Sequence, residues 1–303
     1  MGIYAMAKLT LGSKGESVRL LQKGLSAFTK KDNPLSTYDG IFGINTQEVL
    51  KQYQKENDLP ITGEYDEHTQ EVLQPLINYM FIRISDIDQI ALINDIHPAA
   101  LKAVYSVESK GDGFLPKGYP VILYEGHIFY KYYLAEYGKH EADVLAQRYP
   151  SIVYRQWTSM YYKGGIAEYS RYNAASALNE KIAKLSTSYG LFQVMGFNYK
   201  RAGYSSVDSY VSAMHESEHE QLKAGVSFIR SNSAMFEALQ RLDWPSFAKY
   251  YNGAGYARNS YHIRLARNCR AARSACSGGR RRARCPGPPP GGKRRRPSRR
   301  RRP

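Results

Sequence analysis

Charge is divided unevenly along this chain, and the division limits which part of it can fold around a core. The 303 residues carry a formal net charge of +16. The segment from Arg267 to Pro303 contains 14 Arg and 1 Lys and no acid, so it holds +15 of that charge and residues 1–266 hold only +1. Its arginine blocks and prolines cannot bury apolar surface. We therefore predict a disordered basic tail over residues 267–303, behind a nearly neutral folded body.

The cysteines and the apolar runs narrow the class of the folded body. All three cysteines, Cys269, Cys276 and Cys285, lie in the tail, so we expect the body to have neither a disulfide nor a cysteine metal site. No apolar run approaches the ~20 residues that span a bilayer. The first residues also lack the basic start and apolar stretch of a signal peptide. These features indicate synthesis in a reducing cytoplasm.

Helical spacing of apolar residues divides the body into two domains. Residues 8–74 read as three short helices with glycine-rich connections, and the first helix places Val18, Leu21 and Leu25 on one face. After a patternless stretch that starts at Pro75, the chain is again mainly helical, with a short strand or hairpin expected near residues 119–133. The predicted fold class is mainly α with a small β element. The predicted segments are a first domain at 1–76, a linker at 77–84, a second domain at 85–266 and the tail at 267–303.

One acid stands on the apolar face of a predicted helix in the second domain. Leu101, Val104, Tyr105 and Glu108 fall at i, i+3, i+4 and i+7, so they share a face. Burial and the negative end of the helix dipole both disfavour the ionised carboxylate and should raise its pKa. A carboxyl that keeps its proton near neutral pH suits general-acid cleavage of a glycosidic bond. The alternative is an acid that turns to solvent or pairs with Lys110.

Four motifs in the second domain carry a family resemblance. In order they are VESKGDGF, YEGHIFYKY, SYGLFQVMGFN and YYNGAGY. Together they resemble the N-acetylmuramidase domain of modular phage endolysins, which has a lysozyme-like fold, and the resemblance spans roughly residues 84–265. It implies that Glu108 is the catalytic acid. It also implies that Phe192 and Gln193 line the glycan cleft and that Tyr251 and Asn252 lie near the scissile bond.

A second carboxylate remains open at the level of sequence. Glu125 and Asp112 are candidates, either as a base for an attacking water or as an electrostatic partner of an oxocarbenium-like transition state. The alternatives are a structural hydrogen bond for Glu125 and a turn between two glycines for Asp112.

The first domain has its own resemblance. LGSKGESVRLLQ, YDGIFGINTQEVLKQYQ and LPITGEYDEHT resemble the three-helix peptidoglycan-binding module of cell-wall hydrolases. An alternative, compatible with binding, is that the matching turn only shapes the module. The residues that match its most specific element are Asp39, Gly40, Phe42, Gly43 and Thr46.

HESEH at residues 215–219 raises a competing hypothesis. On a single helix it would place His215 and His219 on one face as zinc ligands, with Glu216 as base. The highly charged flanks and the lack of an obvious third ligand argue against a metal, so we predict no metal and no cofactor.

The resemblance implies a peptidoglycan hydrolase that cleaves the β-1,4 bond between N-acetylmuramic acid and N-acetylglucosamine. The alternatives are a lytic transglycosylase that forms 1,6-anhydro products and a zinc-dependent murein peptidase or amidase. We expect a monomer that waits in the host cytoplasm until lysis and then acts on the wall in the periplasm. The tail is either a contact for anionic outer-membrane lipopolysaccharide or an appended or frame-shifted sequence. The neutral body does not support nucleic acid as a partner.

Overall fold

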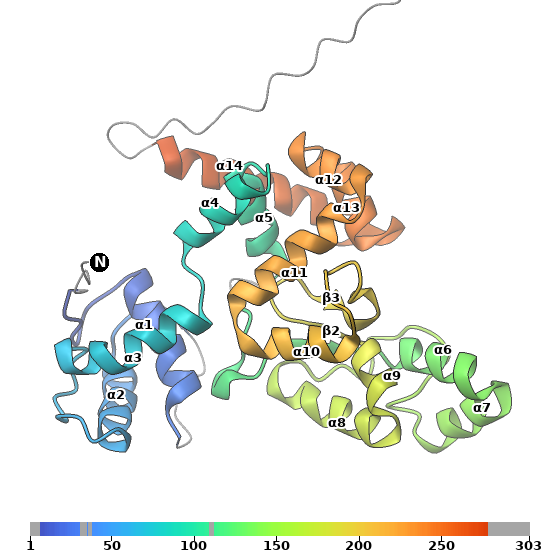
Figure 1. The fold of residues 1–303 in the computed structure, drawn as a ribbon, viewed down its shortest axis with the longest axis horizontal. Coiled ribbons are helices and arrows are strands. Elements are labelled where there is room, and N and C mark those ends of the chain that lie inside the picture. Colours follow the sequence, from blue (N-terminus) through green and yellow to red (C-terminus); the bar gives the residue numbers. More distant parts are fainter. Residues whose placement is uncertain (1–6, 31–34, 36–37, 109–111, 278–303) are drawn as a thin grey trace, which may run out of the picture.

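The computed structural model describes residues 7–30, 35, 38–108 and 112–277. These residues are mainly helical, with one small antiparallel sheet, as the sequence predicts. Figure 1 shows a small helical unit on one side and a larger one on the other, joined where the third helix leads into the fourth. The helices of the small unit are α1 (Glu16–Phe28), α2 (Ile44–Glu56) and α3 (Glu67–Met80).

The turn before α2 is fixed by one buried side chain of α1. Gln22 donates to Asp39 Oδ1 at 2.9 Å and to Thr46 Oγ1 at 3.1 Å, and its own oxygen accepts from the Gly40 N–H at 2.9 Å. Gly40 has φ +71°, and a Cβ there would lie 3.0 Å from the Gly15 carbonyl oxygen, so only glycine fits without strain. The side chain of Phe42 follows into the core of the module.

The predicted linker at 77–84 is mostly helix. Leu73, Ile77 and Met80 lie at i, i+4 and i+7 and are buried, so α3 continues through Pro75 to Met80. Pro75 lies on the exposed face, where water can satisfy the carbonyl that proline leaves unpaired. The connection between the two units is therefore limited to residues 81–83.

The larger unit is a helical domain built around a short sheet. Strands β1 (Ile122–Tyr124), β2 (Thr187–Tyr189) and β3 (Val194–Met195) pair antiparallel in that order, so residues 119–133 supply one strand followed by a helix. The helices are α4 (Ile84–Ile93), α5 (Pro98–Glu108), α6 (Gly126–Tyr137), α7 (Lys139–Arg148), α8 (Glu168–Leu178), α9 (Glu180–Leu185), α10 (Val207–Glu216), α11 (Glu218–Arg230), α12 (Ser233–Gln240), α13 (Trp244–Asn252) and α14 (Tyr261–Ser277).

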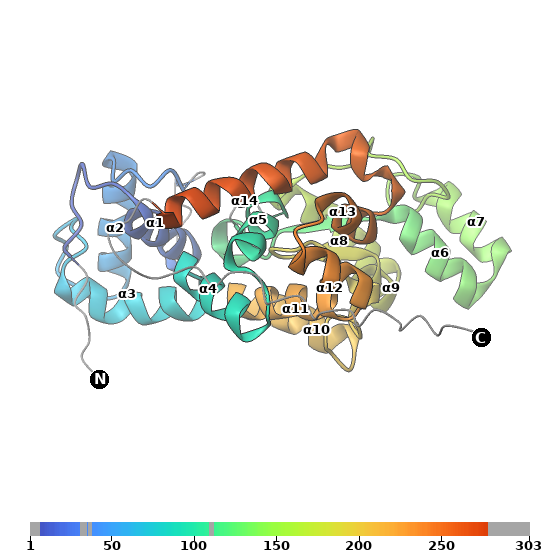
Figure 2. The same cartoon turned by 90° about the horizontal axis from the view of Figure 1, so that it is seen from above.

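The helix α14 corrects the predicted start of the tail. Its residues 267–277 are helical, and α14 packs along α5, as Figures 1 and 2 show from two directions. The reason is an apolar stripe in which Tyr261, Leu265 and Cys269 are spaced by four and join the main core. The folded body thus contains a buried cysteine, contrary to the sequence prediction. Residues 278–303, and with them the predicted disorder and lipopolysaccharide contact, lie outside the described residues. None of the helices in the described part of the chain has the length and apolar character to cross a bilayer.

A buried ion pair joins the two units. Lys23 of α1 and Glu218 of α11 are both almost fully buried, and Lys23 Nζ lies 2.6 Å from Glu218 Oε1. The backbone N–H groups of Ile82 and Gly113 donate to the same carboxylate at 3.1 and 2.9 Å. A Cβ on Gly113 would lie 2.1 Å from Gln221 Oε1, so glycine lets the segment after α5 lie directly against α11. This buried, neutralised charge is therefore one of the contacts that hold the small unit to the larger one.

The HESEH segment does not form one helix. α10 ends at Glu216, Ser217 is extended and caps α11, and His215 and His219 consequently lie on different helices. Because zinc ligation by this motif needs both histidines on one helical face, the break removes that geometry. Within the ranges that the structure describes, no group of three or more His, Cys, Asp or Glu side chains could hold a metal ion.

We expect the Lys23→Met variant to lower the free energy of unfolding by about 3–5 kcal/mol, because it leaves the Glu218 carboxylate buried without a counter-charge. Adding Glu218→Gln should recover part of the loss, since the amide carries no charge and its oxygen can still accept from the Gly113 N–H. Denaturant-induced unfolding of the two single variants and the double variant measures the coupling.

The matched control is Arg241→Met, which removes an exposed ion pair with Glu237 and should cost less than about 1 kcal/mol. Strictly additive losses for Lys23→Met and Glu218→Gln would contradict the assigned role of the buried pair.

Candidate active site

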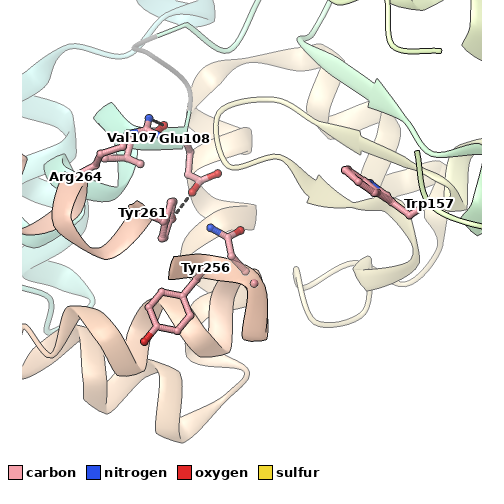
Figure 3. Close-up of a pocket in the computed structure, with 8 residues that line it drawn as sticks. Val107, Glu108, Trp157, Tyr256, Tyr261 and Arg264 are labelled. Carbon is pink, nitrogen blue, oxygen red and sulfur yellow. Dashed lines mark hydrogen bonds between the residues drawn. The ribbon is translucent and has the colours of Figure 1, made fainter. Parts of the chain in front are cut away.

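Glu108 lines a cleft in the larger domain. It is the last residue of α5, and its side chain is partly exposed on the wall of a cleft of about 600 Å³. Figure 3 shows Tyr256, Tyr261 and Arg264 on the same side as Glu108, with Trp157 on the opposite side. The residues that line the cleft are Val107, Glu108, Trp157, Asn252, Gly255, Tyr256, Tyr261 and Arg264.

α14 supplies the groups that fix the carboxyl of Glu108. The Tyr261 hydroxyl donates a hydrogen bond to Glu108 Oε1, and Figure 3 shows the other carboxyl oxygen directed away from Tyr261. The Arg264 guanidinium donates to the carbonyl of Val107 at 3.1 Å, which satisfies an unpaired acceptor at the end of α5. Among the described residues, the acid thus has one oxygen anchored by Tyr261 and no hydrogen bond to the other.

Opposing influences set the protonation of Glu108. Burial raises its pKa to about 7, while the hydrogen bond from Tyr261 and the positive charge of Arg264 act in the lowering direction. Burial is the larger effect, because a carboxylate removed from water loses more than one hydroxyl donor returns. Glu108 is therefore a carboxyl that holds its proton up to neutral pH and can give it up.

Tyr251 supports Tyr261 from behind. The two rings stack with centroids 6.3 Å apart and an interplanar angle of 11°. The Tyr251 hydroxyl donates to the carbonyl of Phe192 at 2.7 Å. Burial raises the pKa of Tyr251, followed by the nearby charge of Glu108, so the hydroxyl keeps its proton. Tyr251 thus lies one layer behind the cleft wall.

The structure separates the four residues predicted to bind the glycan. Asn252 lines the cleft with Glu108. Phe192 is not among the lining residues; its side chain is only 2% exposed and packs in the main core against Gly225. Gln193, at φ +46°, is half-buried and bonds within the sheet, donating to the carbonyls of Val121 and Gly190 and accepting from Ser188. It holds the β2–β3 turn and is not among the residues that line the cleft.

The two candidates for a second carboxylate lie in other environments. Asp112 Oδ1 lies 2.6 Å from Arg19 Nη2 of the small unit, so its charge serves the contact between the units. Glu125 precedes α6, accepts from the Tyr162 hydroxyl at 2.7 Å and is mostly buried. Neither residue lines the cleft with Glu108.

The five matching residues of the small unit form its internal turn. Asp39, Gly40 and Thr46 all bond to Gln22, and the side chains of Phe42 and Thr46 are buried. Asp39 is exposed, and the hydrogen bonds from Gln22 and the Ile41 N–H lower its pKa. Gly43 caps the start of α2. The turn therefore shapes the module. Gly40, Phe42, Gly43 and Thr46 contribute to it by holding the fold, whereas Asp39 is also exposed on the surface.

Four residues that line the cleft were not predicted from the sequence. They are Trp157, Tyr256, Tyr261 and Arg264. Tyr261 and Arg264 come from the segment that was read as the end of the body, although the spacing of Tyr261, Leu265 and Cys269 could have shown the helix. Trp157 lies in an irregular segment, between α7 and α8, where no periodicity indicates which side chains face a site.

Comparisons with known proteins found matches for both units. The family model of N-acetylmuramidase matches residues 97–273, and the model of a peptidoglycan binding domain matches residues 14–73. Among solved structures, the crystal structure of Burkholderia AP3 phage endolysin is similar, with 37% sequence identity and a TM-score of 0.59. That alignment covers 88% of this chain and 99% of the other. No curated protein sequence matches the chain.

We expect the Glu108→Gln variant to be more stable than the wild type at pH 8, and the difference to shrink below pH 5. A folded-state pKa of about 7, raised from 4.5, gives stability that is fully present below pH 4.5 and is lost as the pH rises through 7. The amide removes that loss, which amounts to at most about 3 kcal/mol. Thermal unfolding between pH 4 and pH 9 measures it.

Asp143→Asn is the control of opposite sign. Hydrogen bonds from Lys139 and Tyr130 hold the pKa of Asp143 below its usual value, so this variant should lose stability at neutral pH and regain parity in acid. A Glu108→Gln difference that stays constant across the pH range would contradict the raised pKa.

Proposed function

We propose a catalytic mechanism from one premise: the chain belongs to the N-acetylmuramidase family and joins that domain to a peptidoglycan-binding module, as a phage endolysin does. It is a glycoside hydrolase that hydrolyses peptidoglycan. The proposed scissile bond is the β-1,4 linkage from N-acetylmuramic acid to N-acetylglucosamine, and the proposed general acid is Glu108. The supporting observation is that Glu108 is the one carboxyl among the described residues that line the cleft.

In the first step Glu108 protonates the leaving oxygen. Its pKa of about 7 keeps the carboxyl protonated at and below neutral pH, and its free oxygen faces the space where the glycan would lie. As the C–O bond breaks, positive charge develops on the sugar and Glu108 becomes a carboxylate. The Tyr261 hydroxyl then stabilises the new negative charge through the hydrogen bond it already donates.

In the second step the same carboxylate acts as base. It takes a proton from the water that attacks the anomeric carbon, and Glu108 returns to its protonated state. This assignment follows from the cleft lining, in which the other polar side chains of the described residues are amide, hydroxyl, indole and guanidinium groups. The amide of Asn252 offers a donor and an acceptor to the N-acetyl groups of the substrate.

Hydrolysis and transglycosylation differ in the nucleophile. Attack by water leaves a reducing N-acetylmuramic acid end, whereas attack by the sugar's own 6-hydroxyl leaves a 1,6-anhydro end. Mass spectrometry of digested murein separates the two, and we expect reducing ends.

The small unit would attach the enzyme to the wall through exposed apolar side chains beside the turn. Leu11, Ile41 and Ile44 are all exposed, and the backbone bonds between Gly12 and Phe42 bring their segments together. Exposed apolar clusters of this kind mark binding surfaces. The rigid turn built on Gln22 would keep them in place.

We expect Glu108→Gln to lower kcat on purified murein by a factor of roughly 10³, with sedimentation on murein unchanged. The amide keeps the shape of the side chain but has no proton to give. Wild-type activity should also fall as the pH rises above about 7, because Glu108 then loses its proton. Release of soluble muropeptides measures both effects.

Glu216→Gln provides the control, since Glu216 would be the base in a zinc peptidase. We expect it to retain full turnover. Loss of activity in Glu216→Gln together with full activity in Glu108→Gln would refute the proposed function.

We expect Ile44→Ser to weaken sedimentation with purified murein several-fold while turnover of soluble glycan fragments stays constant. The substitution removes an apolar side chain that is 65% exposed and so leaves the core intact. Ile93→Ser, at an exposed site on α4 of the catalytic domain, is the control and should bind murein like the wild type. Equal effects of the two variants would argue against this surface.

A further inference from the structure

The side chain of Trp157 presents a large aromatic face to the cleft. It is 63% exposed, lines the cleft and lies across it from Glu108 in Figure 3. Its indole Nε1 donates to the hydroxyl of Tyr162 at 3.1 Å. This hydrogen bond fixes the edge of the ring, while the face of the ring stays in contact with water. Exposing a large apolar face to water is unfavourable, and a ligand that covers the face would remove that exposure.

Tyr162 links Trp157 to a mostly buried acid, Glu125, by hydrogen bonds. Its hydroxyl accepts from Trp157 and donates to Glu125 Oε1 at 2.7 Å. Burial, followed by the hydrogen bond to Glu125, raises the pKa of Tyr162, so the hydroxyl keeps the proton that it donates. The other carboxyl oxygen of Glu125 lies 3.2 Å from Nδ1 of His127. Among the described residues, Tyr162 is thus hydrogen-bonded to one oxygen of Glu125, and the other oxygen lies beside His127 without a hydrogen bond.

Tyr162 packs against Arg171, a buried side chain with several partners. The guanidinium of Arg171 lies 5.7 Å from the centre of the Tyr162 ring. Arg171 is 2% exposed and is paired with the fully buried Glu168 on the same helix, α8. It also donates to the carbonyl of Tyr124 in β1 at 3.1 Å. Tyr162 therefore packs against a side chain that is itself locked between α8 and the sheet.

We propose that Trp157 is a stacking platform for a pyranose ring of the glycan strand, and that Tyr162 and Glu125 are positioning residues that hold it opposite Glu108. The inference rests on the proposed function and adds a second wall to its substrate site. The apolar face of a pyranose ring packs well on an indole, which offers a large rigid area and loses little conformational entropy. Glu125 then acts through Tyr162 and Trp157, not on the reacting atoms.

Tryptophan fluorescence tests the platform directly. The chain has two tryptophans, and Trp244 is largely buried in the core, so changes on ligand binding report Trp157. The probe is a set of peptide-free oligosaccharides of alternating N-acetylglucosamine and N-acetylmuramic acid, titrated into Glu108→Gln, which binds without turnover. We expect a blue shift and protection from acrylamide quenching. Both should vanish in Trp157→Phe/Glu108→Gln.

Kinetics on the same oligosaccharides test the positioning residues. Tyr162→Phe removes the bridging hydroxyl and keeps the ring, so we expect KM to rise roughly tenfold with kcat within about twofold. Glu125→Ala should raise KM and leave kcat nearly unchanged, as Tyr162→Phe does. Glu125→Gln keeps an oxygen that accepts from Tyr162 and should restore a KM near that of the wild type. Tyr161→Phe, one residue away, is the control.

The outcomes separate this inference from the proposed function. A large loss of kcat in Glu125→Gln would make Glu125 a reacting carboxylate and overturn its positioning role. Unchanged glycan affinity in Trp157→Ala, in a protein that still needs Glu108 for turnover, would overturn the platform alone. Full turnover in Glu108→Gln would refute the proposed function, while the fluorescence titration of the wild type would still decide whether glycan covers Trp157.

Discussion

The buried carboxylate of Glu218 constrains how the two domains of this enzyme can be arranged. A charge without water must be neutralised by the elements around it, and here the partners come from separate parts of the chain. They are Lys23 of the wall-binding module, the backbone N–H of Ile82 in the short connection, and the N–H of Gly113 in the segment after Glu108. Displacing any one of them leaves the charge unsatisfied. The module is consequently docked against the segment that follows α5, and this contact, together with the Arg19–Asp112 ion pair, holds its orientation relative to the cleft.

The sequence was informative where chemistry depends on local spacing. Glu108 could be proposed because four residues of one helix share a face, and the structure places that acid on the cleft with a pKa raised by burial. Tyr261 and Trp157 could not be assigned to the cleft. The spacing around Tyr261 indicates a helix but not that this helix packs beside Glu108, and Trp157 lies in a segment without periodicity. The motif containing Phe192 and Gln193 was assigned to the cleft by resemblance. It instead holds the sheet and the core, since a motif match does not say which way a side chain points.

The same distinction explains the errors in the fold. The three helices of residues 8–74 and the mainly helical character of the second domain followed from apolar periodicity. The start of the tail was predicted from the arginine-rich composition of residues 267–303. That average hides the apolar stripe of α14, which continues from Leu265 to Cys269. The sequence analysis argued against a metal at HESEH from its charged flanks, and the break at Ser217, which caps a new helix, could not be read from the motif itself. Composition alone therefore gave the wrong start of the tail, because a short apolar stripe decides where the last helix ends.

The position of Tyr261, 153 residues beyond its partner Glu108, has a consequence for biosynthesis. Ribosomes release a polypeptide from its amino end, so α5 emerges long before α14 exists to cover it. During that interval the carboxyl faces water and ionises like any ordinary glutamic acid, which leaves no proton for bond cleavage. Only when the final helix docks does the acid acquire its working state. Under the proposed mechanism, a chain that ends before α14 would therefore lack a protonated general acid at neutral pH.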